Sequence, residues 1–197
     1  MATALKKPLY NGKKVTFDEY QKLKYDGFQY EIIKGVMKVT PSPFFRHQKL
    51  ILKISYLIEN YLEKNPIGDV SIAPRDVKLD ETLTYQPDIL YISKERFNIN
   101  KKRYVDGSPD FIIEVVSKGT LTHDAGQKFN DYEKYGVKEY WIMNPDDLEV
   151  SEFYYLIDGK YEQFEPEKNI IKSRVIENFE INLEELEKNI RKYEVLE

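Results

Sequence analysis

Two carboxylates beside strand-like apolar runs are the residues best placed to do chemistry in this sequence. Asp88 follows Gln86 and Pro87 and opens the apolar run 89–92, and Glu114 lies late in the run 111–116. Both runs are typical of buried strands. A carboxylate avoids such surroundings unless its charge is compensated. A divalent cation held by both acids would compensate it, because hard cations bind carboxylate oxygens.

The separation of the two acids allows them to meet. Asp88 and Glu114 are 114 − 88 = 26 residues apart, which leaves room for a loop that brings two strands side by side. Their carboxylates would then converge on one magnesium or manganese ion. Such an ion lowers the pKa of a bound water and neutralises charge on a phosphate oxygen, as phosphodiester hydrolysis requires. A nearby lysine would orient the water or stabilise the developing charge.

Strand patterns alternate with helix patterns along the chain, which predicts a mixed α/β or α+β sheet domain. The expected helices are 16–25, opened by a Thr16–Glu19 capping box, 43–65 with apolar residues spaced by three and four, 122–135 and 182–189. The expected strands and hairpins are 30–40 with a turn at Lys34–Gly35, 69–73, 75–79, 89–92, 111–116, 139–143, 148–164 and 170–176.

Length and composition fit one globular domain. The chain has 197 residues, of which 41% are hydrophobic and 14% aromatic. Its 30 basic and 34 acidic residues give a net charge of −4, so only a local basic surface could contact nucleic acid. No cysteine is present, which leaves oxygen ligands or the two histidines for a metal. No signal-peptide core or membrane-spanning run is found, so we expect a soluble cytoplasmic protein.

Two basic segments have alternative interpretations. Residues 1–15 are expected to form a flexible basic arm, and its simplest role is that of a solubilising tail. Segment 93–103 is either a solvated loop or a phosphate-contacting loop beside the two acids. The candidate DNA-contacting residues of this segment are Lys94, Arg96, Lys101, Lys102 and Arg103.

The expected helix 122–135 carries Asp124, Lys128 and Tyr132 on one stripe, at intervals of four residues. Its Asp-Lys pair is either an ordinary surface pair or part of a site. Similarly, Glu31 is either an outward-facing strand residue or a functional acid, and His47 is either a surface residue or a neighbour of a phosphate.

Several motifs in order resemble the Uma2 family of restriction-endonuclease-like proteins, which belongs to the PD-(D/E)XK nuclease superfamily. The motifs are Tyr30-Glu31 with Gly35, Pro41-Ser-Pro43 with His47, Gln86-Pro-Asp88, the run 109–117 with Glu114, Asp124 with Lys128 and Tyr132, the run 136–141, and Asn144-Pro145. The resemblance implies a mixed central β-sheet flanked by helices. It also implies a nuclease-like domain at 16–157 and an extension, 158–197, packed on the same domain.

Site roles carry over from this resemblance residue by residue. They imply that Asp88 and Glu114 bind magnesium, with the Val115 backbone carbonyl as a third ligand. The superfamily places its lysine two residues after the second acid, where this chain has Val116, and Lys128 matches the lysine that Uma2 proteins use instead. Glu31 matches an early acid that points toward the metal site. The expected supporting residues are His47, Gln86, Asp124 and Tyr132.

The expected function is therefore a DNA endonuclease that depends on Mg²⁺ or Mn²⁺. The main alternative is a nuclease fold that binds DNA or dimerises without cleaving. A second alternative is a glycosidase that uses the two acids without a metal. We also expect a homodimer, for which the aromatic-rich hairpin after Leu148 is the candidate interface.

Overall fold

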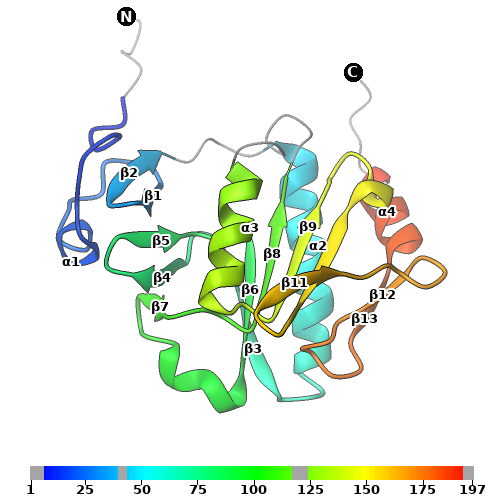
Figure 1. Ribbon diagram of the computed structural model, residues 1–197. Coiled ribbons are helices and arrows are strands. Elements are labelled where there is room, and N and C mark those ends of the chain that lie inside the picture. Colours follow the sequence, from blue (N-terminus) through cyan, green and yellow to red (C-terminus); the bar gives the residue numbers. More distant parts are fainter. Residues whose placement is uncertain (1–6, 40–43, 117–123, 193–197) are drawn as a thin grey trace, which may run out of the picture.

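A six-stranded mixed sheet forms the centre of the computed structural model, which describes residues 7–39, 44–116 and 124–192. Helices α2 and α3 cover opposite faces of this sheet (Figure 1). In spatial order the strands are β11 (Lys160–Gln163), β10 (Glu152–Ile157), β9 (Glu139–Met143), β8 (Phe111–Val115), β6 (Ile89–Ser93) and β3 (Gly68–Ile72). The β8–β9 pair is parallel and the other pairs are antiparallel. The predicted mixed sheet flanked by helices is thereby confirmed.

The apolar spacing of the longest helix explains its place in the core. Helix α2 (Phe45–Leu62) buries Leu50, Ile54 and Ile58 completely against the sheet. Helix α3 (Asp124–Tyr135) lies on the opposite face, and α4 (Leu183–Arg191) packs beside α2. None of the helices in the described ranges is long and apolar enough to cross a membrane.

A second, smaller sheet lies beside α3 and was only partly predicted. In spatial order its strands are β2 (Val36–Val39), β1 (Tyr30–Ile33), β5 (Leu83–Tyr85), β4 (Asp76–Asp80) and β7 (Tyr104–Asp106). The β1–β2 hairpin turns at Lys34 and Gly35, both with positive φ, as predicted. Strands β5 and β7 were not predicted, because three residues are too few to show a hydrophobic period. Segments 69–73 and 75–79 form strands of different sheets.

The N-terminal segment is attached to this small sheet along residues 9–15. Gly12 N–H donates to the Met37 carbonyl at 2.8 Å, and Val15 N–H donates to the Gly35 carbonyl at 2.9 Å. These bonds satisfy backbone groups at the edge of the hairpin. The described part of the expected arm 1–15 is therefore docked. Helix α1 (Phe17–Tyr20) has the predicted capping box but is shorter than the expected helix 16–25.

The C-terminal segment shares the core of α2. Strands β12 (Ile170–Lys172) and β13 (Glu180–Asn182) form a hairpin, and Ile176 and Phe179 between them are buried in the α2 cluster. The observed strand β12 is thus shorter than the predicted strand 170–176. Buried Glu139 anchors this segment, since it accepts hydrogen bonds from the Ser173 hydroxyl and two following backbone N–H groups. The domain boundaries at 16–157 and 158–197 stay a prediction.

A buried ionic cluster fixes the sheet end at Ser93. Asp110 is completely buried and accepts hydrogen bonds from Ser93 N–H at 2.9 Å, Arg96 at 3.1 Å and Lys138 at 2.8 Å. Burial by itself raises the pKa of Asp110, but bonds from Lys138, Ser93 and Arg96 outweigh it and lower the pKa below its ordinary value.

We expect Asp110→Asn to lower the free energy of unfolding by about 2 kcal/mol at neutral pH, because it removes charge-assisted hydrogen bonds. A carboxylate with a lowered folded pKa contributes stability above its unfolded pKa, and this contribution disappears as pH falls through the folded pKa. The difference from wild type should therefore shrink below about pH 4. Urea denaturation at both pH values measures it, with exposed Asp69→Asn as control. An equal loss at both pH values would contradict the assignment.

Candidate active site

Asp88 and Glu114 lie opposite each other at one end of the six-stranded sheet. Ile89 of β6 pairs with Ile113 of β8 in antiparallel register, so the next pair outward is Asp88 with Glu114. Opposed residues of an antiparallel pair project from the same face. Asp88 Oδ2 also accepts a 2.8 Å hydrogen bond from Val115 N–H, which holds the Asp88 carboxylate against the end of β8. The strand register therefore brings the two predicted acids together.

Lys128 reaches this acid pair from helix α3. Its Nζ lies 2.9 Å from Glu114 Oε1 and 3.0 Å from Glu31 Oε1, and Glu31 comes from β1 of the small sheet. Tyr132, one turn further along α3, donates its hydroxyl to Glu114 Oε1 at 2.8 Å. The consecutive elements β8 and α3 thus meet the distant strand β1 in one ionic network. Val116 packs among apolar residues instead of entering this network.

Burial and neighbouring charges shift the pKa values of Glu114 and Lys128 in this network. Burial, together with the negative charges of Asp88 and Glu31, raises the pKa of Glu114 to about 7, although the Lys128 ammonium opposes the shift. Burial alone would lower the pKa of Lys128, but Glu114 and Glu31 outweigh it and hold that pKa well above its ordinary value. Lys128 is therefore a permanent cation at physiological pH.

His47 approaches Asp88 from the first turns of α2. Its Nε2 lies 3.2 Å from Asp88 Oδ2. Burial lowers the pKa of His47, but the hydrogen bond to Asp88 and the charges of Asp88 and Glu114 outweigh it, so the pKa is raised. Its Nδ1 is buried and contacts no hydrogen-bond partner in the described ranges. The neighbouring carboxylates thus favour the protonated form of this histidine beside the acid pair.

Gln86 links the site to the small sheet. Its backbone N–H donates to Glu31 Oε1 at 3.1 Å, and its side-chain amide donates to Asp76 at 2.8 Å. Gln86 thus positions Glu31 without contacting the acid pair itself. The side chain of Asp124 lies outside the described residues.

Sequence reasoning missed two tyrosines beside Lys128. Its Nζ lies 5.3 Å from the centre of the Tyr85 ring, a cation–π distance. Tyr140 packs on Tyr132 with ring centres 5.2 Å apart, and its buried hydroxyl has no partner among described groups. Strand alternation could have placed Tyr140 on the α3 face of β9, since Tyr140 pairs with Ile112 two residues before Glu114.

The basic segment 93–103 starts at the end of the large sheet that is opposite the two acids and then returns to the small sheet, where β7 follows it. It starts where β6 ends, whereas Asp88 stands at the beginning of β6 (Figure 1). Five residues of strand separate them by roughly 17 Å. The start of the segment is therefore distant from the two acids, whereas a phosphate-contacting role of its later residues, which Arg75 holds beside β4, stays a prediction.

The contacts of this segment explain its position. Arg96 binds buried Asp110, and Arg75 holds the backbone carbonyls of Lys101 and Lys102. Residues 94–99 form a short 3₁₀ helix, η1 (Lys94–Ile99). Arg96 is thus part of a structural ion pair. A DNA contact from the other four residues, Lys94, Lys101, Lys102 and Arg103, stays a prediction.

The donor set of the acid pair fits one divalent cation bound mainly by oxygen. All hydrogen bonds that described residues make to Asp88 and Glu114 fall on Oδ2 and Oε1, which leaves Oδ1 and Oε2 for an ion. In the described ranges, no group of three or more His, Asp and Glu side chains is arranged to hold a metal. An ion would therefore need water or a backbone carbonyl, such as that of Val115, as further ligands.

Some rings of the aromatic hairpin that is the candidate dimer interface pack against α3 of the same chain. Phe129 of α3 lies 4.9 Å from Tyr154 and 5.1 Å from Tyr161, measured between ring centres. These rings pack against the middle of α3. A homodimer through this hairpin stays a prediction.

A mixed sheet with acids at the ends of adjacent strands and a lysine from a flanking helix defines a restriction-endonuclease-like protein. The family model of Uma2, described as "Putative restriction endonuclease", matches residues 17–184. The chain therefore belongs to the Uma2 family, which confirms the resemblance found in the sequence.

A solved structure supports the fold. It is described as a "putative nuclease belonging to DUF820 from Anabaena variabilis". Its TM-score with this chain is 0.73 at 17% identity, over 89% of this chain and 99% of that one. At this identity the likeness shows the fold. No curated protein matches the chain.

We expect Lys128→Met to destabilise the protein by about 3–5 kcal/mol near pH 8, because it leaves buried Glu114 and partly buried Glu31 without their cation. The raised pKa of Glu114 means that the folded state binds an extra proton between 4.5, its ordinary pKa, and about 7. Stability therefore falls as pH rises through this range. Without the ammonium the folded pKa of Glu114 is higher still, so the fall extends to higher pH and is larger in total.

Urea denaturation near pH 5 and pH 8 tests this expectation, and the loss in Lys128→Met should be smaller at the lower pH. Lys134→Met is the matched control, since Lys134 is an exposed lysine on the same helix. A loss in Lys128→Met that does not change with pH would show that Glu114 and Lys128 are not coupled.

Proposed function

We propose that the chain is a DNA endonuclease that depends on Mg²⁺ or Mn²⁺ and hydrolyses phosphodiester bonds. One observation carries the proposal: the buried Lys128 amine contacts Glu114 and Glu31 beside Asp88, which is opposite Glu114 across two strands. Family membership and the nuclease-like fold support it. Val116 stands two residues after Glu114, where the superfamily has its lysine. In this chain Lys128 would take that role from α3.

Asp88, Glu114 and the Val115 carbonyl would hold the metal. When bound, the ion supplies charge neutralisation at a phosphate oxygen and acidifies a water molecule. Lys128 has three N–H donors, of which Glu31 and Glu114 accept two. The third can donate to an attacking water or to a phosphate oxygen. Glu31, held by Gln86 N–H and Lys128, is placed to accept a proton from that water.

Plasmid nicking tests the proposal. We expect wild-type protein to convert supercoiled plasmid to the open circle with Mg²⁺ or Mn²⁺ and not with EDTA. Glu114→Gln should reduce the rate by about a hundredfold or more, because it removes a charged ligand. Lys128→Ala should reduce it similarly. Lys134→Ala, on the exposed side of α3, should nick like wild type. Nicking at the wild-type rate by Glu114→Gln would reject the assignment.

Metal binding can be measured without turnover. We expect Mn²⁺ to raise the thermal midpoint of wild-type protein, because a ligand that binds only the folded state stabilises it. Asp88→Asn should abolish the rise. The control Asp69→Asn changes an exposed carboxylate on edge strand β3 and should retain it. A midpoint that rises equally in Asp88→Asn would place the bound ion elsewhere.

One observation favours a second candidate function, a nuclease fold that binds DNA without cleaving it. Glu114 already contacts Lys128 and Asp88 already contacts His47, so each acid has a partner within the chain. Retained DNA binding without cleavage of any substrate in Mg²⁺ or Mn²⁺ would favour this function.

A further inference from the structure

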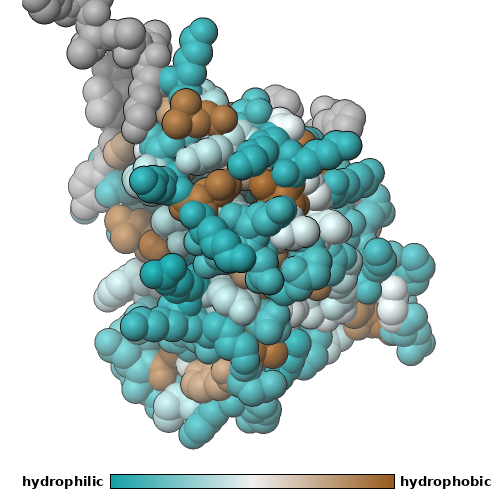
Figure 2. Space-filling view, turned by 90° about the vertical axis from the view of Figure 1, so that its left-hand side faces the viewer, coloured by the Kyte–Doolittle hydropathy of each residue, from teal (hydrophilic) through white to brown (hydrophobic). Residues whose placement is uncertain are grey.

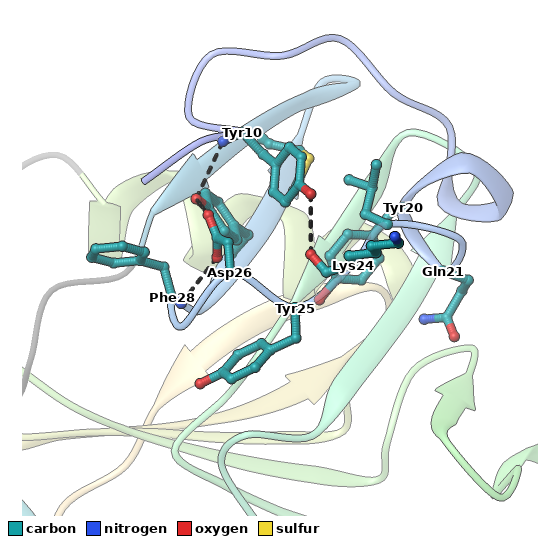
Figure 3. Close-up of a pocket in the computed structure, with 10 residues that line it drawn as sticks. Tyr10, Tyr20, Gln21, Lys24, Tyr25, Asp26 and Phe28 are labelled. Carbon is teal, nitrogen blue, oxygen red and sulfur yellow. Dashed lines mark hydrogen bonds between the residues drawn. The ribbon is translucent and has the colours of Figure 1, made fainter. Parts of the chain in front are cut away.

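A tyrosine-rich pocket opens on the side of the small sheet that faces away from α3. Its volume is about 170 Å³. In Figure 3 the rings of Tyr10, Tyr25 and Phe28 lie around Asp26. The pocket is formed by α1, the segment that follows it, and the β1–β2 hairpin, and it is lined by Tyr10, Tyr20, Gln21, Leu23, Lys24, Tyr25, Asp26, Phe28, Tyr30 and Met37.

Hydrogen bonds fix three of the four tyrosine rings. The Tyr10 hydroxyl donates to the Lys24 carbonyl at 3.1 Å, the Tyr30 hydroxyl to Asp26 at 2.8 Å, and the Tyr20 hydroxyl to Asp76 at 3.4 Å. Tyr25 is different, because 83% of the residue is exposed and its hydroxyl has no partner among the described residues. The pocket therefore offers preorganised rings and one large exposed ring at its edge.

Asp26 stabilises the pocket and is not available to a ligand. It is buried and accepts hydrogen bonds from Leu9 N–H at 2.9 Å, Phe28 N–H at 3.1 Å and the Tyr30 hydroxyl at 2.8 Å. These bonds tie the N-terminal segment to the wall of the pocket. A carboxylate so fully engaged does not recruit a cationic ligand.

Three lysines lie in or next to the segments that form the pocket and supply positive charge for an anionic ligand, and Glu19 offsets part of the charge of Lys13 and Lys22. Lys24 lines it, exposed Lys22 lies between two lining residues, and exposed Lys13 has its Nζ 5.7 Å from the centre of the Tyr10 ring. Figure 2, which faces this side of the molecule, shows hydrophobic residues in small groups among hydrophilic ones. Aromatic faces next to cationic side chains are the combination that binds single-stranded nucleic acid.

We propose that this pocket binds a planar base that carries a phosphate, with the base stacked on Tyr25 and the phosphate near the lysines. The inference rests on the proposed function only in taking nucleic acid as the ligand. A base inside a duplex is stacked on its neighbours, so the pocket selects unpaired bases. A free nucleotide has the same chemistry and is distinguished below.

A chain of hydrogen bonds connects the pocket to the candidate active site. Tyr20 and Gln21 of the pocket both donate to Asp76, which also accepts from Gln86, and the Gln86 backbone donates to Glu31. Tyr30 and Glu31 are neighbours on β1, so their side chains lie on opposite faces of the small sheet. A single strand bound at the acids therefore has to pass the end of β1 to place a base in the pocket.

Fluorescence anisotropy tests the inference in EDTA, so that cleavage does not interfere. The probes are a fluorescein-labelled oligothymidine strand and its duplex with oligoadenosine, and thymidine monophosphate is the competitor. We expect Tyr25→Ala to weaken single-strand binding by about tenfold to a hundredfold, the range for loss of one base-aromatic stack. Tyr25→Phe should bind normally, because stacking uses the face of the ring. Duplex binding should change little.

Tyr56→Ala is the matched control, since Tyr56 is 63% exposed on α2, away from the pocket. Equal affinities of Tyr25→Ala and Tyr56→Ala for the single strand would overturn the inference, even if plasmid nicking proceeds normally. Binding that depends on Tyr25 without metal-dependent cleavage would support the pocket and reject the nuclease. Competition by thymidine monophosphate at concentrations similar to the oligonucleotide would identify a free nucleotide as the occupant.

Discussion

The buried charge of Lys128 is the constraint on which the site depends. A buried ammonium is stable only where carboxylates surround it, and here Glu114 and Glu31 do so at 2.9 and 3.0 Å. The same contacts hold α3 against β8 and bring the small sheet next to the large one. The same ionic contacts therefore stabilise the fold and position the candidate catalytic side chains.

This dependence explains why the protein needs two sheets. The large sheet alone supplies Asp88 and Glu114 through the register of β6 and β8. The small sheet supplies Glu31 through β1, and its buried Tyr85 closes the site from the side. Because both sheets pack on α3, a shift of that helix would separate the lysine from both carboxylates together.

The two ends of the large sheet use charge differently. At one end, Asp110 is matched by Arg96 and Lys138, and its pKa is lowered, as in a structural ion pair. At the other end, acids outnumber their buried cation, and the pKa of Glu114 is raised to about 7. An excess of acids that is only partly compensated is the arrangement expected where a cation or a phosphate-bound ion enters.

The sequence by itself determined the strands that carry Asp88 and Glu114, the long helix α2, and the family, because these depend on local apolar periods and on motif order. Tertiary structure decided which charges meet. Lys128 and Glu31 are 97 residues apart in the sequence, and no local sequence pattern encodes their contact. For the same reason the composition of the basic segment did not show that Arg96 binds Asp110, at the opposite end of β6 from the acids.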